Sequence, residues 1–196
     1  MRRVLFFGDS NTYGLDPAGG HSGQQYPPEV RWSGIVAKKL EGSWEVIEDG
    51  RNGRCIPELS YEFEELDALL DSCGELDLFA VMLGTNDYLS QPHPRPEKVA
   101  ERLRQLLTHV RERMTVKFLV IAPPLLDFTG DRFYKPWSTL DGRLSAAERE
   151  VAEEFDADFL DAAAMDLAVY EGDHIHLMSE GHRKLAAYVL AYFKKL

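Results

Sequence analysis

Three side chains of types that support nucleophilic catalysis stand in two distant parts of the sequence. A serine hydroxyl is a weak nucleophile at neutral pH, so it needs a neighbouring base and a group that orients this base. Ser10 follows a short apolar run, and Asp173 and His176 stand close together near the C-terminus. Because one compact turn can hold both of these side chains, we assign Ser10 as nucleophile, His176 as base and Asp173 as orienting carboxylate.

A serine that attacks a carbonyl creates a negatively charged oxygen, which needs hydrogen-bond donors already in place. The backbone N–H groups of Ser10 and Gly53 and the side-chain amide of Asn86 are the predicted donors of this oxyanion hole. Gly53 can also serve a turn with positive φ, which is compatible with presenting its N–H. Asn86 alone could be a cap of the turn that follows it, and Asp87 is interpreted as a structural cap.

Five short apolar runs predict β-strands at residues 4–7, 44–47, 76–83, 116–122 and 157–160. The second strand is expected to end at the turn signal Glu48-Asp49-Gly50. Short runs without polar alternation are typical of strands that are buried on both faces of a parallel sheet.

Apolar residues at helical spacing predict helices over residues 31–40, 57–70, 96–114, 144–155 and 179–193. Pro57 and Pro96 are expected in the first turns of their helices, and Ser179 is expected to be an N-cap. Alternating strands and helices predict an α/β protein with three layers, in which helices cover both faces of a five-stranded parallel sheet. We expect one domain over residues 1–196.

The predicted strands bring the candidate residues together. Ligands of open α/β sheets bind at the carboxyl ends of the strands. Ser10 follows the first strand, Gly53 comes soon after the second, and Asn86 follows the third. Three separate segments are therefore expected to meet at one edge of the sheet, with Asp173 and His176 reaching it from the segment before the last helix.

The overall charge restricts the classes of partner. A net charge of -11 argues against binding to nucleic acid and to anionic membrane surfaces. The apolar run after Arg2-Arg3 stops at Gly8, too early for a signal peptide, so we expect a cytoplasmic protein without a membrane partner. Cys55 and Cys73 form no metal-binding pattern and are expected to be buried, and no metal or cofactor is expected.

Four blocks of the sequence resemble the SGNH, or GDSL-type, hydrolases. These blocks are GDSN at 8–11, Asn52-Gly53, GTND at 84–87 and DHIH at 173–176. The residues that name that family correspond to Ser10, Gly53, Asn86 and His176, and the resemblance covers nearly the whole chain. It implies a flavodoxin-like fold and a serine esterase. Asn11 departs from the family pattern, which has leucine there, and this difference bears on substrate fit.

Three further segments, Arg31-Trp32, EVIEDGRNGR and MLGTND, look like the arylesterase and acyltransferase branch of these hydrolases. That branch implies small ester substrates with short acyl groups and aryl or alkyl alcohols, acyl transfer, and assembly into homo-oligomers. Other branches deacetylate sugars or hydrolyse lysophospholipids and acyl thioesters, and these alternatives stay open. The candidate substrate-binding residues are Asn11, Tyr13, Trp32 and Ile175.

Two functions of other classes are weighed against this one. A metal-dependent phosphoesterase would hold two cations. The candidate ligands of these cations are Asp9, Asn86, Asp87, His174 and His176. A carbohydrate-binding module without activity would not need a complete triad.

Two further features have open roles in the sequence. The irregular segment 125–141 could form packing, a pocket or an oligomer interface through its aromatic residues, which are Phe128, Phe133, Tyr134 and Trp137. His182 is expected to be partly exposed or at the edge of the core.

Overall fold

The computed structural model describes residues 1–19, 24–126, 128 and 142–196. Five strands form one sheet in the order β2-β1-β3-β4-β5, and every neighbouring pair is parallel. The strands are β1 (Arg2–Gly8), β2 (Trp44–Gly50), β3 (Leu78–Met82), β4 (Lys117–Ala122) and β5 (Asp158–Asp161).

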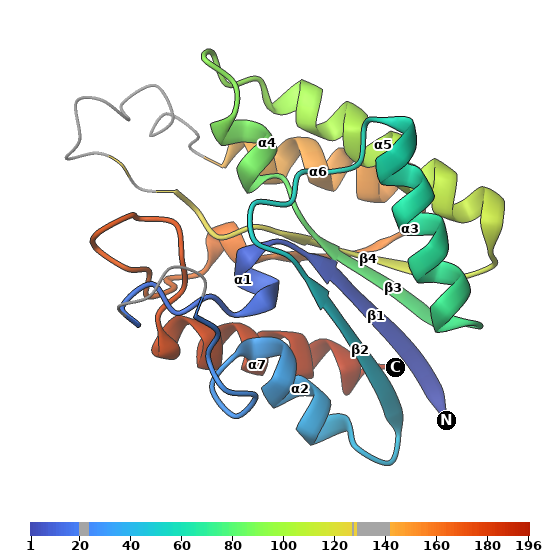
Figure 1. Cartoon of the computed structure of the whole chain (residues 1–196), viewed down its shortest axis with the longest axis horizontal. Helices are drawn as coiled ribbons and strands as arrows, with labels where there is room; N and C mark the ends of the chain where they lie inside the picture. Colours follow the sequence, from blue (N-terminus) through green and yellow to red (C-terminus); the bar gives the residue numbers. More distant parts are fainter. Residues whose placement is uncertain (20–23, 127, 129–141) are drawn as a thin grey trace.

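Helices cover both faces of this sheet (Figure 1). The helices α3, α5 and α6 lie on one face, whereas α2 and α7 lie on the other. The helices are α1 (Ser10–Tyr13), α2 (Trp32–Leu40), α3 (Ser60–Cys73), α4 (Thr85–Leu89), α5 (Pro96–Arg113), α6 (Arg143–Glu154) and α7 (Ser179–Phe193), with the 3-10 turn η2 (Ala162–Ala164). The prediction of a three-layer α/β protein with a five-stranded parallel sheet is confirmed, and its strand order is that of the flavodoxin-like fold.

Alternation along the strands divides the core into two halves. Leu5 and Phe7 of β1 belong to the cluster shared with α3, α5 and α6. Val4 and Phe6 belong to the cluster on the opposite face, against α2 and α7. Because successive strand residues point to opposite faces, a run of apolar residues supplies both halves of the core at once.

The end of β2 and the start of α3 differ from their predicted positions. β2 continues through Gly50, although Glu48 and Asp49 carry charge, because their carboxylates have partners in Arg31 and Arg54. The helix predicted from Pro57 begins only at Ser60.

The shift of α3 follows from its capping interactions. The Glu62 carboxylate accepts hydrogen bonds from the N–H groups of Glu58 and Leu59 (2.8 and 2.9 Å), which fixes the start of α3.

The start of α7 also differs from its prediction. Ser179 is the first residue of α7 and Met178 takes the N-cap position, so the prediction of Ser179 as N-cap is wrong.

His182 is fully buried, and the prediction that it lies partly exposed or at the core edge is therefore wrong. Its Nδ1 accepts a hydrogen bond from the Trp32 N–H (3.3 Å), so its proton sits on Nε2. Within the described part of the chain Nε2 has no hydrogen-bond partner. Burial lowers the pKa of His182 to about 4.

This low pKa makes the stability depend on pH. The ordinary pKa of a histidine is about 6.5. Between this pH and about pH 4, His182 is protonated in the unfolded chain but neutral in the folded protein. The free energy of unfolding should therefore decrease as the pH is lowered through this window, by on the order of 3 kcal/mol from this group. His182→Asn keeps an acceptor for Trp32 but does not titrate. In urea unfolding at pH 7 and pH 4, the variant should lose less stability than the wild type, and equal losses would contradict this assignment.

Among the described residues, no helix has both the length and the apolar character needed to cross a membrane.

Candidate active site

Ser10 lies at the carboxyl edge of the sheet, directly after the first strand. β1 ends at Gly8, and the Asp9 carboxylate caps α1 by accepting the Asn11 N–H (2.9 Å). The end of β2 packs directly against α1. A Cβ on Gly50 would lie 2.0 Å from the backbone nitrogen of Tyr13, so only glycine allows this approach. Ser10 is thereby held as the first residue of a short helix, with 5% of its surface exposed.

The structure brings the three predicted catalytic side chains together. Ser10 Oγ lies 2.9 Å from Nε2 of His176, and Nδ1 of the same ring lies 2.8 Å from Oδ2 of Asp173. The two ring nitrogens thus join the hydroxyl to the carboxylate in one line of hydrogen bonds. This is the arrangement in which an imidazole can take a hydroxyl proton while the carboxylate orients the ring.

A tight turn fixes Asp173 relative to His176. The other carboxylate oxygen, Oδ1, accepts the backbone N–H groups of Ile175 (2.8 Å) and His176 (3.0 Å). His174 lies between them with a φ of 58°. Burial opposes the ionised form of Asp173, but the hydrogen bonds from His176 and Ile175 outweigh it and lower the pKa of this carboxyl. Asp173 is therefore an anion at neutral pH, as an orienting group must be.

The predicted oxyanion donors come from three separate segments at this edge, namely α1, the loop after β2, and α4. Gly53 has a φ of 74° and is exposed in the loop between β2 and α3, which confirms its turn role, and the use of its N–H as an oxyanion donor stays a prediction. Asn86 lies in the first turn of α4, where its Nδ2 donates one hydrogen bond to the carbonyl of Arg54 (3.0 Å). A primary amide has a second N–H, which this contact leaves for a ligand.

Asp87 ties two of these loops together. Its buried carboxylate accepts the Ile56 N–H (3.0 Å to Oδ2) and pairs with Arg102 of α5 (3.0 Å). The role of Asp87 is structural, as predicted, but its contacts join the segment of Ile56 to α5 and are not those of a helix cap. Arg102 and Arg54 were not found by sequence reasoning, because no spacing links them to the motifs they contact.

Buried carboxyl groups lie below the site. Burial raises the pKa of Asp9 to about 6 and also raises the pKa of Asp87. Glu148 of α6 is 1% exposed, and burial raises its pKa well above the ordinary value. Its carboxyl packs against Gly84, where a Cβ would lie 2.5 Å from Oε1. This glycine has a φ of 117° and is the N-cap of α4, so the Glu148 carboxyl supports the turn that carries Asn86.

Asn11 connects the nucleophile to the segment of the base. Its side chain is buried and spans both neighbours of His176, because Nδ2 donates to the Ile175 carbonyl (3.2 Å) and Oδ1 accepts the Leu177 N–H (2.9 Å). The structure therefore gives Asn11 a clamping role instead of the expected contact with substrate.

Trp32 also has a different position from the one expected. It is 1% exposed, its indole N–H donates to the Asn11 carbonyl (2.9 Å), and its ring packs on Phe6. A side chain buried in this way offers no surface to a ligand, so its role is to support α1. Tyr13 and Ile175 are each partly buried beside the triad, and their contact with substrate stays a prediction.

His174 and the aromatic segment complete the surroundings of the site. The His174 ring contacts Phe128 at 6.1 Å between centroids, away from the triad line. Phe128 itself is buried. Phe133, Tyr134 and Trp137 lie outside the described residues.

The ligand set of a phosphoesterase does not assemble. In the described ranges, no group of three or more His, Cys, Asp or Glu side chains is placed to hold a metal ion. Asp87 is committed to Arg102 and Ile56, and His176 to Ser10 and Asp173. Cys73 is buried as expected, whereas Cys55 is half-buried.

Removing the Asn11 clamp should lower stability. Asn11→Ala leaves the buried Leu177 N–H without its acceptor, at a cost of about 1–3 kcal/mol in the free energy of unfolding. Urea unfolding measures this loss. Asn52→Ala, an exposed asparagine, should change stability by less than about 0.5 kcal/mol. Equal effects of the two substitutions would contradict the clamping role.

Known proteins share this fold. Residues 6–184 match the GDSL-like Lipase/Acylhydrolase family. Because this match spans most of the chain, the protein belongs to that family of hydrolases. A comparison with curated protein sequences returned no match.

Three solved structures resemble the whole chain. The native aryl esterase of M. Smegmatis is 26% identical with a TM-score of 0.84, and the match covers 100% of both chains. Est24, a carbohydrate acetylesterase from Sinorhizobium meliloti, is 29% identical with a TM-score of 0.83, covering 100% of this chain and 99% of Est24. A putative arylesterase from Agrobacterium tumefaciens is 28% identical with a TM-score of 0.82 and the same coverage.

Proposed function

We propose that this protein is a serine esterase that hydrolyses small carboxylic esters through an acyl-enzyme on Ser10. The observation that carries the proposal is the line of hydrogen bonds from Ser10 Oγ through the His176 ring to the Asp173 carboxylate, 2.9 and 2.8 Å long. Family membership supports ester hydrolysis in general, and the triad geometry supports the serine mechanism in particular.

The reaction proceeds in two steps. Nε2 of His176 takes the Ser10 proton as Oγ bonds to the ester carbonyl carbon, and the carbonyl oxygen becomes negatively charged. The N–H groups of Ser10, Gly53 and Asn86 stabilise this oxygen. The tetrahedral intermediate then collapses, His176 returns the proton to the departing alcohol, and the acyl group stays on Ser10. Water, activated by the same histidine, releases the acid.

Another alcohol can replace water in the second step, which would make the protein an acyltransferase. The similarity to an aryl esterase and to a carbohydrate acetylesterase supports short acyl groups, because both proteins are esterases and one of them acts on acetyl esters. We therefore propose acetyl and similarly short esters of aryl, alkyl or sugar alcohols as substrates.

A panel of chromogenic substrates tests this function. The wild-type protein should hydrolyse p-nitrophenyl acetate faster than p-nitrophenyl octanoate, and EDTA should leave the rate unchanged. It should not hydrolyse p-nitrophenyl phosphate. Phosphatase activity that EDTA abolishes would overturn the proposal in favour of a metal-dependent phosphoesterase. Acetylated sugars, p-nitrophenyl acetate and acetyl thioesters, compared by kcat/KM, then identify the preferred alcohol.

A further inference from the structure

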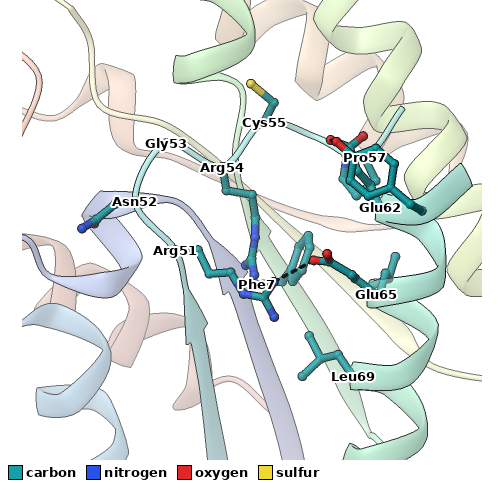
Figure 2. Close-up of a pocket in the computed structure, with 12 residues that line it drawn as sticks. Phe7, Arg51, Asn52, Gly53, Arg54, Cys55, Pro57, Glu62, Glu65 and Leu69 are labelled. Carbon is teal, nitrogen blue, oxygen red and sulfur yellow. Dashed lines mark hydrogen bonds and ion pairs between the residues drawn. The ribbon is translucent and has the colours of Figure 1, made fainter. Parts of the chain in front are cut away.

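A hollow lies beneath the loop that carries Gly53, between this loop and α3 (Figure 2). Its volume is about 290 Å³, and Phe7, Leu66 and Leu69 contribute an apolar floor. The Arg54 side chain forms part of its wall and runs from the loop toward Phe7, whereas Asn52 points away from the hollow. A guanidinium group therefore underlies the loop that presents the Gly53 N–H.

The contacts of this guanidinium join the ends of two strands. Arg54 donates to the carbonyl of Gly8 (3.0 Å) and to the carbonyl of Asp49. It also pairs with the Asp49 carboxylate (2.6 Å), and its central carbon lies 4.2 Å from the centre of the Phe7 ring. Only 10% of the side chain is exposed. A planar, forked donor with this many partners is held in one position, which a lysine could not reproduce.

The backbone of Arg54 makes the third connection, because its carbonyl accepts the Asn86 amide. Each segment that carries a predicted oxyanion donor thus meets Arg54. Gly8 precedes Ser10 by two residues, Gly53 is the adjacent residue of the loop, and Asn86 is bound directly. A second hydrogen bond joins the same two segments, because the Asp87 carboxylate accepts the N–H of Ile56, two residues after Arg54.

We infer that Arg54 is a positioning residue, which sets the relative placement of the three oxyanion donors from beneath the loop. This inference rests on the proposed function. Hydrogen-bond donors stabilise a developing oxyanion only when they stand in place before the reaction, so a small displacement of one loop lowers the rate.

Arg51 provides a matched control in the same loop. It also lines the hollow, but 51% of its side chain is exposed, and its guanidinium pairs with Glu65 (3.0 Å) and with Asp49 (3.5 Å). Among the described residues, no hydrogen bond or ion pair joins its side chain to Ser10, Gly53 or Asn86. Arg51→Ala removes the same charge from the same hollow and should leave turnover of p-nitrophenyl acetate within about twofold of the wild type.

Three variants test the inference by steady-state kinetics, with thermal unfolding to show that each is folded. Arg54→Ala should lower kcat about 100-fold with KM nearly unchanged, because oxyanion contacts act on the transition state. Arg54→Lys keeps a cation near Phe7 but lacks the fork, so its kcat should fall at least tenfold. Arg51→Ala should resemble the wild type.

Chemical rescue distinguishes positioning from general support of the fold. Because Arg54 lines a hollow open to solvent, its truncation leaves space that a small cation can enter. Ethylguanidine at millimolar concentration should restore kcat of Arg54→Ala at least tenfold, whereas ethylammonium at the same concentration should not. Neither compound should affect Arg51→Ala.

The outcomes separate this inference from the proposed function. If wild type and Arg51→Ala show no esterase activity, both are wrong. If they are active and the folded Arg54 variants are equally active, only the role of Arg54 is wrong. Should Arg54→Ala not fold, Arg54→Lys decides, and an unchanged kcat in that folded variant overturns the inference. A loss in Arg54→Ala that ethylguanidine does not reverse also counts against it.

Discussion

Ser10→Ala should lower kcat for p-nitrophenyl acetate by at least about 10⁴-fold, toward the roughly 10⁶-fold loss typical of such units. The hydroxyl lies 2.9 Å from His176 Nε2, within the distance needed for direct proton transfer. His176→Ala should have a similar effect. Because the two side chains act as one unit, the double variant should be no slower than the worse of the single variants.

Stopped-flow and steady-state rates of the purified variants measure these losses. Ser72→Ala is the matched control, since Ser72 is exposed on α3 and its hydroxyl donates to the Leu69 carbonyl (2.7 Å). It should keep the wild-type rate. Independent, multiplicative losses in the double variant would show that Ser10 and His176 do not act together.

Asp173→Asn should lower kcat by about 10⁴-fold while the fold is kept. The side-chain oxygen of the asparagine would still accept the N–H groups of Ile175 and His176. Its NH₂ group would then face Nδ1 of His176, which must accept a hydrogen bond and leave its proton on Nε2. A protonated Nε2 points at Ser10 and cannot take its proton.

Rate measurements across pH test this explanation. The variant should stay slow at every pH at which it is folded, because the wrong tautomer is present whatever the charge elsewhere. Glu171→Gln removes a negative charge from an exposed position in the same segment and should retain the wild-type rate. A loss of equal size in Glu171→Gln would indicate that general charge, and not the orientation of the ring, matters.

The architecture could be predicted because it depends on local patterns. The buried strands are continuous apolar runs, and the long helices carry apolar residues at helical spacing, so their order along the chain already implies a covered parallel sheet. The end of β2 could not be predicted in this way. Glu48 and Asp49 look like turn residues in the sequence, and only the fold brings Arg31 and Arg54 to their carboxylates.

In the candidate site too, residues in local motifs could be predicted, whereas residues that act through distant contacts could not. Ser10, Asn86 and His176 stand in short motifs whose chemistry can be recognised from residue type alone. Arg54 stands beside a motif but shows its contacts with Gly8 and Asn86 only in three dimensions. Asn11 was expected at the substrate, because sequence shows its nearness to Ser10 but not its contacts with the segment of His176.

The central claim is that Ser10 is the nucleophile, and covalent labelling tests it most directly. The wild-type protein is incubated with a fluorophosphonate, digested, and its peptides are identified by mass spectrometry. We expect one phosphonyl group on Ser10, formed at the same rate as esterase activity is lost. The label should be absent from Ser10→Ala, and labelling should be much slower in His176→Ala. Full inactivation with the label on another residue, or an esterase that stays active and unlabelled, would contradict the claim.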